Sequence, residues 1–182
     1  WTRDEYIQMS EWGWFTDCKV ELIGGEVIEM AAQFNNHAAG VTLTADALRV
    51  AFGPGYWVRT QATVDLSPHG MPDPDVAVVP GSPRTAAPRG IPTTALLVVE
   101  ISESTLSVDR NLMASLSAAG SITEYWIVNL VQRQLEVHHN PAPDSTRAFR
   151  FWYADRTILD PGDVIAPLAA PNARVAVADL LP

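Results

Sequence analysis

The sequence has few or none of the residues that several protein classes depend on. Its 182 residues include one cysteine, Cys18, which excludes internal disulfides and cysteine-based zinc sites and favours a reducing, cytoplasmic location. No run of about 18 apolar residues occurs, so we expect no membrane span. The opening WTRDEYIQMS lacks the basic-then-apolar order of a secretory signal, and without an initial methionine we expect further residues upstream.

Positive charge is also scarce. Twelve basic residues face 21 acidic ones, for a formal net charge of −9, and Lys19 is the single lysine among them. Proteins that hold nucleic acid by its phosphates usually present a basic face. The net acidity therefore counts against tight, non-specific binding of nucleic acid.

Several recognisable hydrolase motifs are missing as well. The sequence has no G-x-S-x-G, no P-loop and no H-E-x-x-H, so serine hydrolases, nucleotide hydrolases and zinc proteases have no motif support. His138 and His139 are adjacent on an expected strand and would point to opposite faces, which is poor geometry for chelation. Six tryptophans suggest stacking on bases, but strand positions favour a core role, and those flanking the first helix could cover a subunit contact.

Hydrophobic spacing indicates an α/β domain. We expect helices over residues 3–10 and 36–52 and in the stretch that opens at Asp109. Strands are expected at residues 20–23, 26–30, 56–66, 75–79, 95–101, 124–130, 134–139 and 148–154. The strand at 95–101 is almost purely apolar, as in a central strand covered on both faces. This order predicts one domain over residues 1–182, with a central mixed sheet flanked by helices.

Three carboxylates stand in unusual places. Glu100 ends an apolar strand, Asp75 begins another directly after Pro74, and Glu26 opens the second strand of a Gly-Gly hairpin. If the strands of Asp75 and Glu100 are neighbours, their carboxylates converge at one end of the sheet. Carboxylates with water form the oxygen environment that Mg²⁺ or Mn²⁺ prefers. The alternative is ordinary: carboxylates at strand ends often cap loops or form ion pairs.

Several motifs occur in an order that points to one family. DEY, ELIGGE, PDVAVV, VVEIS and EYWIV together resemble the Uma-type (Uma-two) family of "putative restriction endonucleases", similar to the PD-(D/E)XK nuclease superfamily. The resemblance implies a restriction-endonuclease-like fold and a metal site at Asp75 and Glu100, with Glu26 as a further carboxylate. It implies that Glu21 faces the core, and that His37 positions a neighbour or caps the following helix.

The lysine of that superfamily is missing from its usual places. Two residues past the second acid the chain has Ser102, and in the family pattern D-R-x-x-K-x-x-x-Y it has Met113 for the lysine and Ser117 for the tyrosine. Loss of a comparable group costs about 100- to 1000-fold in rate. Arg110 could still clamp a phosphate, although it is a poor proton acceptor. Lys19, in the first hairpin, offers no obvious substitute.

The same stretch carries no charged side chain between Arg110 and Glu124. A surface helix normally has a solvated charged stripe. Either this helix is buried on nearly all sides, or a charged working residue has been lost. The comparison with the family pattern favours the loss.

These observations lead to a ranked set of functions. The first is a metal-dependent DNA endonuclease, in which Glu26, Asp75 and Glu100 are catalytic and bind Mg²⁺ or Mn²⁺, and in which DNA is the partner of a homodimer. Its activity is expected to be reduced or lost. The rival is a catalytically inactive binding or interaction module with the same fold, and a small-molecule metallohydrolase has little support.

Overall fold

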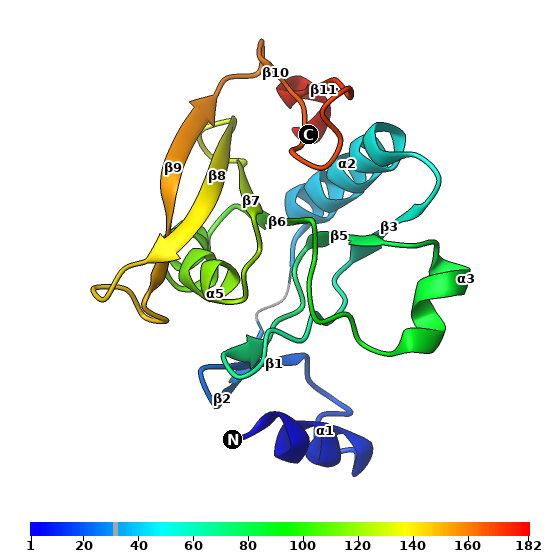
Figure 1. Cartoon of the computed structure of the whole chain (residues 1–182), viewed down its shortest axis with the longest axis vertical. Helices are drawn as coiled ribbons and strands as arrows, with labels where there is room; N and C mark the ends of the chain where they lie inside the picture. Colours follow the sequence, from blue (N-terminus) through cyan, green and yellow to red (C-terminus); the bar gives the residue numbers. More distant parts are fainter. Residues whose placement is uncertain (31–32) are drawn as a thin grey trace.

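A six-stranded mixed sheet forms the centre of the computed structural model, which describes residues 1–30 and 33–182 (Figure 1). Its order is β3-β5-β6-β7-β8-β9. The pair β6–β7 is parallel and the other neighbours are antiparallel. The expected central mixed sheet is confirmed, with strands β3 (Tyr56–Thr60), β5 (Val76–Pro80), β6 (Leu97–Ser102), β7 (Glu124–Asn129), β8 (Gln134–Pro143) and β9 (Phe151–Leu159).

Helix α2 (Asn35–Phe52) covers one face of this sheet. Its core residues recur at spacings of four, three and four, which places Val41, Ala45, Leu48 and Phe52 on one side of the helix against the strands. Gly40 belongs to the same side and lies close to Ile101 of β6. The chain end, with β10 (Val164–Ile165), β11 (Val175–Ala176) and η3 (Val177–Leu180), packs beside α2 and completes this layer (Figure 1).

The opposite face is covered by a helical segment in three parts. These are α4 (Leu106–Val108), the π-helical turn η2 (Asp109–Met113) and α5 (Ala114–Ala119), which packs against β9. Every residue from Met113 to Ala118 is buried. Burial on nearly all sides therefore explains why this part of the helix carries no charge. For residues 114–118 this corrects the expectation that a charged working residue has been lost.

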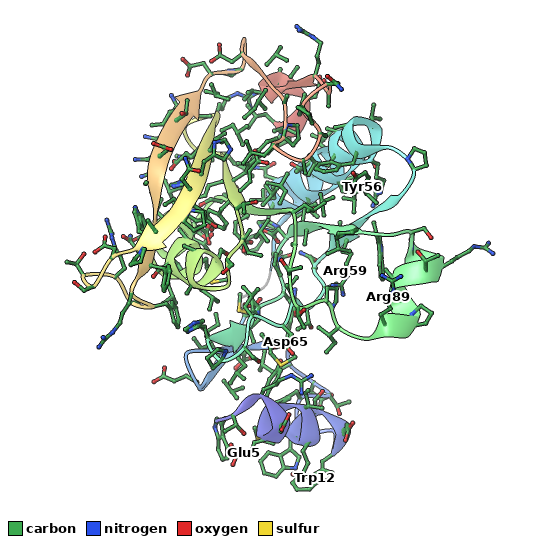
Figure 2. All side chains as sticks on the ribbon, viewed as in Figure 1. Glu5, Trp12, Tyr56, Arg59, Asp65 and Arg89 are labelled. Atoms are coloured by element: carbon green, nitrogen blue, oxygen red, sulfur yellow. The ribbon has the colours of Figure 1, made fainter. Side chains whose placement is uncertain are left out.

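A smaller sheet lies below the main one (Figure 1). It has the order β2-β1-β4 and consists of β1 (Val20–Ile23), β2 (Glu26–Glu29) and β4 (Gly70–Met71). Helix α1 (Arg3–Glu11) packs at its outer end, where Thr2 and Glu5 form a capping box and Arg3 forms an ion pair with Asp65. Figure 2 shows Trp12 at the far side of α1, pointing away from the rest of the chain.

Three expected strands have clearly different limits. The strand expected at residues 134–139 continues to Pro143 as β8. The expected strand 56–66 stops at Thr60, because Gln61 takes a positive φ of 48° and its amide donates to the carbonyl of Pro74. The expected strand 148–154 is shifted to β9, since residues up to Arg150 form the turn that follows β8. The Pro-rich loop contains the short helices α3 (Pro83–Ala86) and η1 (Ala87–Arg89). Among the described helices, none has the length and apolar character to cross a membrane.

Candidate functional site

Asp75 and Glu100 meet where β5 and β6 lie side by side. Val76 pairs with Val99 in this antiparallel register, so the next residues of the two strands, Asp75 and Glu100, also face each other. The backbone amide of Asp75 donates to Glu100 Oε2 at 3.2 Å, and the amide of Ile101 donates to Asp75 Oδ2 at 2.9 Å. The convergence expected from the sequence is therefore present in the structure.

A cavity of about 380 Å³ lies directly at this pair. Buried or half-buried carboxylates from other segments also line it: Glu21 of β1, Asp73 of the loop before β5, Glu103 just after β6, and Asp109 of the π-helical turn, together with the exposed Glu29 of β2. Apolar side chains from the hairpin, from the start of α2 and from the π-helical turn also line it: Ile23, Ile28, Phe34, Leu112 and Met113. The lining thus combines a concentration of acidic groups with apolar surface.

Asp75 is held in place by groups from two directions. His37 of α2 places its Nε2 2.9 Å from Asp75 Oδ2, while Gln33 and Gln61 each approach Asp75 Oδ1 at 3.5 Å. The bond to Asp75 is the main reason why the pKa of His37 is raised. The expectation that His37 positions a neighbour agrees with this contact, and the neighbour is Asp75.

For the other buried carboxylates at the site, the ionised form is energetically unfavourable. Burial raises the pKa of Glu100 well above its usual range, and the charges of Asp75 and Asp109 add to the rise. Burial likewise raises the pKa of Glu21 to about 7 and that of Asp109 to about 6. Among the described residues, Glu21 Oε2 is buried without a hydrogen-bond partner. Such groups are stabilised in the ionised state by a nearby cation.

The structure places Glu26 elsewhere, which corrects its expected position. Glu26 directly follows the Gly24-Gly25 turn, pairs with Ile23 at the closed end of the hairpin, is exposed, and does not line the cavity. Its predicted role in catalysis and metal binding stays a prediction without support from the geometry. Glu21, which was expected to face the core, is the hairpin glutamate that is buried at the site.

Arg110 is engaged away from the cavity, so the expected phosphate clamp is corrected. Its Nε donates to both carboxylate oxygens of the fully buried Glu136 at 3.0 Å, and Arg156 donates to Glu136 Oε2 at 2.7 Å. The amide of Asn129 also donates to Glu136. These residues form an internal network that neutralises one buried carboxylate.

Lys19 is the functional candidate that the sequence alone did not identify. It lies at the entrance to β1 and lines the same cavity as Asp75 and Glu100. The signal in the sequence was the alternation Lys19-x-Glu21-x-Ile23, because alternate residues of a strand share a face. All three of these side chains line the cavity.

The donor set suits a hard divalent cation held by few protein ligands. Across residues 1–30 and 33–182, no three or more His, Cys, Asp or Glu side chains are grouped closely enough to form a metal site by themselves. Mg²⁺ commonly binds through one or two carboxylates and keeps several waters. The pair Asp75 and Glu100, with its excess of buried negative charge nearby, fits that mode of binding.

Comparisons with known proteins agree with this fold. The profile of the Uma2 family, described as "Putative restriction endonuclease", matches residues 3–178. A crystal structure from Anabaena variabilis, titled a "putative nuclease belonging to DUF820", has a TM-score of 0.72 at 14% identity, over 99% of this chain and 97% of that one. That likeness shows a common fold, and no curated protein matches the chain. The chain belongs to the Uma2 family.

Proposed function

We propose that the chain is a divalent-cation-dependent nuclease that hydrolyses phosphodiester bonds of DNA in the cavity at Asp75 and Glu100. The observation that carries the proposal is the pairing of these two carboxylates across β5 and β6, at a cavity large enough to admit part of a substrate. Membership of the Uma2 family supports the same reaction class.

Asp75 and Glu100 would hold Mg²⁺ or Mn²⁺. When bound, the ion supplies positive charge that stabilises negative charge developing on the phosphoryl oxygens. It would also lower the cost of keeping Glu100 ionised, because burial and its acidic neighbours otherwise favour the protonated form.

The residues around this pair have separate tasks in the proposal. His37 and the amide of Ile101 fix the orientation of Asp75 through its Oδ2. Glu21 would accept at its unpartnered Oε2 the proton that the attacking water loses, because a general base works best when its pKa is near the working pH and the pKa of Glu21 is about 7. Phe34 and Leu112 contribute apolar surface to the lining of the same cavity.

A second candidate is a binding module that has kept the fold without turnover. Two observations favour it: Met113 is an apolar side chain in the wall of the cavity, and Arg110 is bound to Glu136. This function predicts that the protein binds a partner but leaves DNA intact under all metal conditions.

The test is calorimetric titration of Mn²⁺ into the wild type, Asp75→Asn and Glu100→Gln, followed by a cleavage assay on DNA. Both changes keep the shape of the side chain and remove its charge, so we expect metal binding to be lost and cleavage to fall by at least about 100-fold. Asp46→Asn is the matched control, because Asp46 is exposed on α2 and pairs with Arg49.

Two results would contradict the assignment. Mn²⁺ binding by Asp75→Asn at the affinity of the wild type would remove Asp75 from the site. Wild-type protein that binds Mn²⁺ and never cleaves DNA would favour the binding module.

A further inference from the structure

The cavity contains many acidic groups and very few basic ones. A phosphodiester is an anion, and six buried or half-buried carboxylates around the cavity repel it: Glu21, Asp73, Asp75, Glu100, Glu103 and Asp109. A bound cation offsets part of that repulsion, but a second positive group that reaches the substrate would strengthen its binding and its reaction. The question is which side chain of this chain can provide that group.

Three arginines of neighbouring segments make their hydrogen bonds and ion pairs outside the cavity. Arg110 binds Glu136, and Arg3 binds Asp65 and Asp4. Arg59 donates to the carbonyl of Thr63 and lies over the ring of Trp57 at 5.0 Å. None of the three lines the cavity. Among the described residues of its lining, the basic side chains are His37, which is bound to Asp75, and Lys19.

Strand geometry directs Lys19 towards the same cavity as Glu21. Its carbonyl accepts from the amide of Met30, which extends the β1–β2 ladder by one pair beyond Val20 and Glu29. In a strand, residues two apart point to the same face, so Lys19 and the buried Glu21 project together. The same alternation explains why Met30, the partner of Lys19, also lines the cavity.

The electrostatic neighbours of Lys19 are consistent with this placement. Burial raises the pKa values of both Glu21 and Asp73, and the positive charge of Lys19 opposes the rise at each of them. Lys19 therefore lies within electrostatic reach of two carboxylates on different segments. Its side chain is exposed, and its flexible stem is free to move towards a ligand.

We propose that Lys19 contacts the phosphate of the substrate in this cavity and supplies the positive charge that the helix position Met113 does not. The contact is an ammonium donor to a non-bridging phosphate oxygen, which requires no proton transfer from Lys19. This role rests on the proposed nuclease function. It assigns Lys19 as a catalytic residue and a phosphodiester as the group that it recognises.

The test compares Lys19→Met with Lys19→Arg and with Arg84→Met, which removes one exposed positive charge from α3, outside the cavity. The first readout is kcat and KM for a short fluorescein-labelled single-stranded oligonucleotide in Mn²⁺. The second is the anisotropy of the same oligonucleotide in a chelator, where cleavage is excluded. The third is Mn²⁺ affinity by calorimetry.

For Lys19→Met we expect kcat to fall by about 100-fold, in the range measured for removal of one transition-state donor. Oligonucleotide affinity in chelator should weaken several-fold, whereas Mn²⁺ affinity should not weaken. Lys19→Arg should keep the oligonucleotide affinity and part of kcat, and Arg84→Met should resemble the wild type. The double variant Lys19→Met/Met113→Lys should regain activity over Lys19→Met, because it returns a lysine to the same cavity.

Failure of this inference is distinct from failure of the nuclease proposal. If Asp75→Asn is inactive while Lys19→Met cleaves and binds like Arg84→Met, the nuclease function stands and the role of Lys19 is overturned. If the wild type does not cleave DNA, the nuclease proposal fails, and binding in chelator decides the role of Lys19. A selective loss of affinity in Lys19→Met would then support a phosphate contact, and equal affinity would overturn it.

Discussion

At the scale of one residue, Glu21 shows how burial in the cavity favours the protonated form of a carboxyl group. Its carboxyl is buried at the site and one of its oxygens has no hydrogen-bond partner among the described residues, so ionisation without a cation is costly. Burial raises its pKa from 4.5 to about 7, Asp73 adds to the rise, and Lys19 opposes it. Between about pH 4.5 and 7, Glu21 is therefore mostly protonated in the folded protein and mostly ionised in the unfolded chain.

This shift predicts the pH dependence of stability in metal-free protein. Between about pH 4.5 and 7 the folded state binds more protons at Glu21 than the unfolded state, so the free energy of unfolding falls as the pH rises through this window. At pH above 7, Glu21 lowers the free energy of unfolding by about 3 kcal/mol at most. Urea unfolding of the wild type and Glu21→Gln in chelator, across this window, measures it.

Glu21→Gln should show a shallower decline, because its amide does not titrate. The decline should not vanish, since the raised pKa values of Glu100 and Asp109 act in the same direction. Parallel pH profiles for the two proteins would contradict the assignment of the shift to Glu21. Added Mn²⁺ should reduce the decline in the wild type by favouring the ionised carboxylates.

Helix α2 determines at the scale of an element how the site is held. It carries His37, which contacts Asp75, and one turn later Gly40, where the helix backbone lies close to Ile101 of β6. A Cβ atom at Gly40 would lie 2.7 Å from Cγ2 of Ile101, which belongs to a stiff, β-branched side chain next to Glu100. The helix and strand are therefore in close contact at the point that aligns His37 with Asp75.

Gly40→Ala is predicted to destabilise the protein in spite of the higher helix propensity of alanine. Overpacking typically costs about 1–3 kcal/mol, which exceeds the gain of up to about 1 kcal/mol from replacing glycine in a helix. Urea unfolding measures the net effect. Gly162→Ala is the matched control, since a Cβ at Gly162 meets nothing within 4 Å. Equal stability of both variants would show that α2 can move away from β6 without cost.

Net charge is the property that matters at the scale of the whole molecule. The chain carries a formal charge of −9, and Lys19 is its one lysine. A net charge of this sign counts against an extended track of phosphate contacts, so we expect the proposed recognition of DNA to be concentrated at the cavity. The homodimer and the cytoplasmic location stay predictions; sedimentation equilibrium would test the first.

Oligonucleotide binding should accordingly depend weakly on salt. For single strands the slope of log K against log salt is about −0.7 for each phosphate neutralised, so one or two contacts predict a slope of about −1. Anisotropy titrations in chelator at several salt concentrations measure this slope. A slope steeper than about −4 would reveal a basic track outside the cavity, and Lys19→Met should make the observed slope shallower by a fraction of a unit.

The sequence by itself determined the parts of this protein that depend on local pattern. The apolar run ending at Glu100 had to be a strand covered on both faces, and the four-three-four spacing in residues 36–52 had to be a helix with one core face. Asp75 and Glu100 could be singled out because a carboxylate beside a buried strand is unusual. Their convergence then required only that two strands be neighbours.

Tertiary structure alone decided which other side chains complete the site. Lys19 and Glu21 line the same cavity as Asp75 because the first hairpin packs near the end of the main sheet, which brings together segments more than fifty residues apart in a way that no local periodicity encodes. The same packing leaves Glu26 exposed, and a buried carboxylate, Glu136, holds Arg110 away. Alternation along a strand determines which side chains lie on the same face, but only the packing of the elements determines what that face contacts.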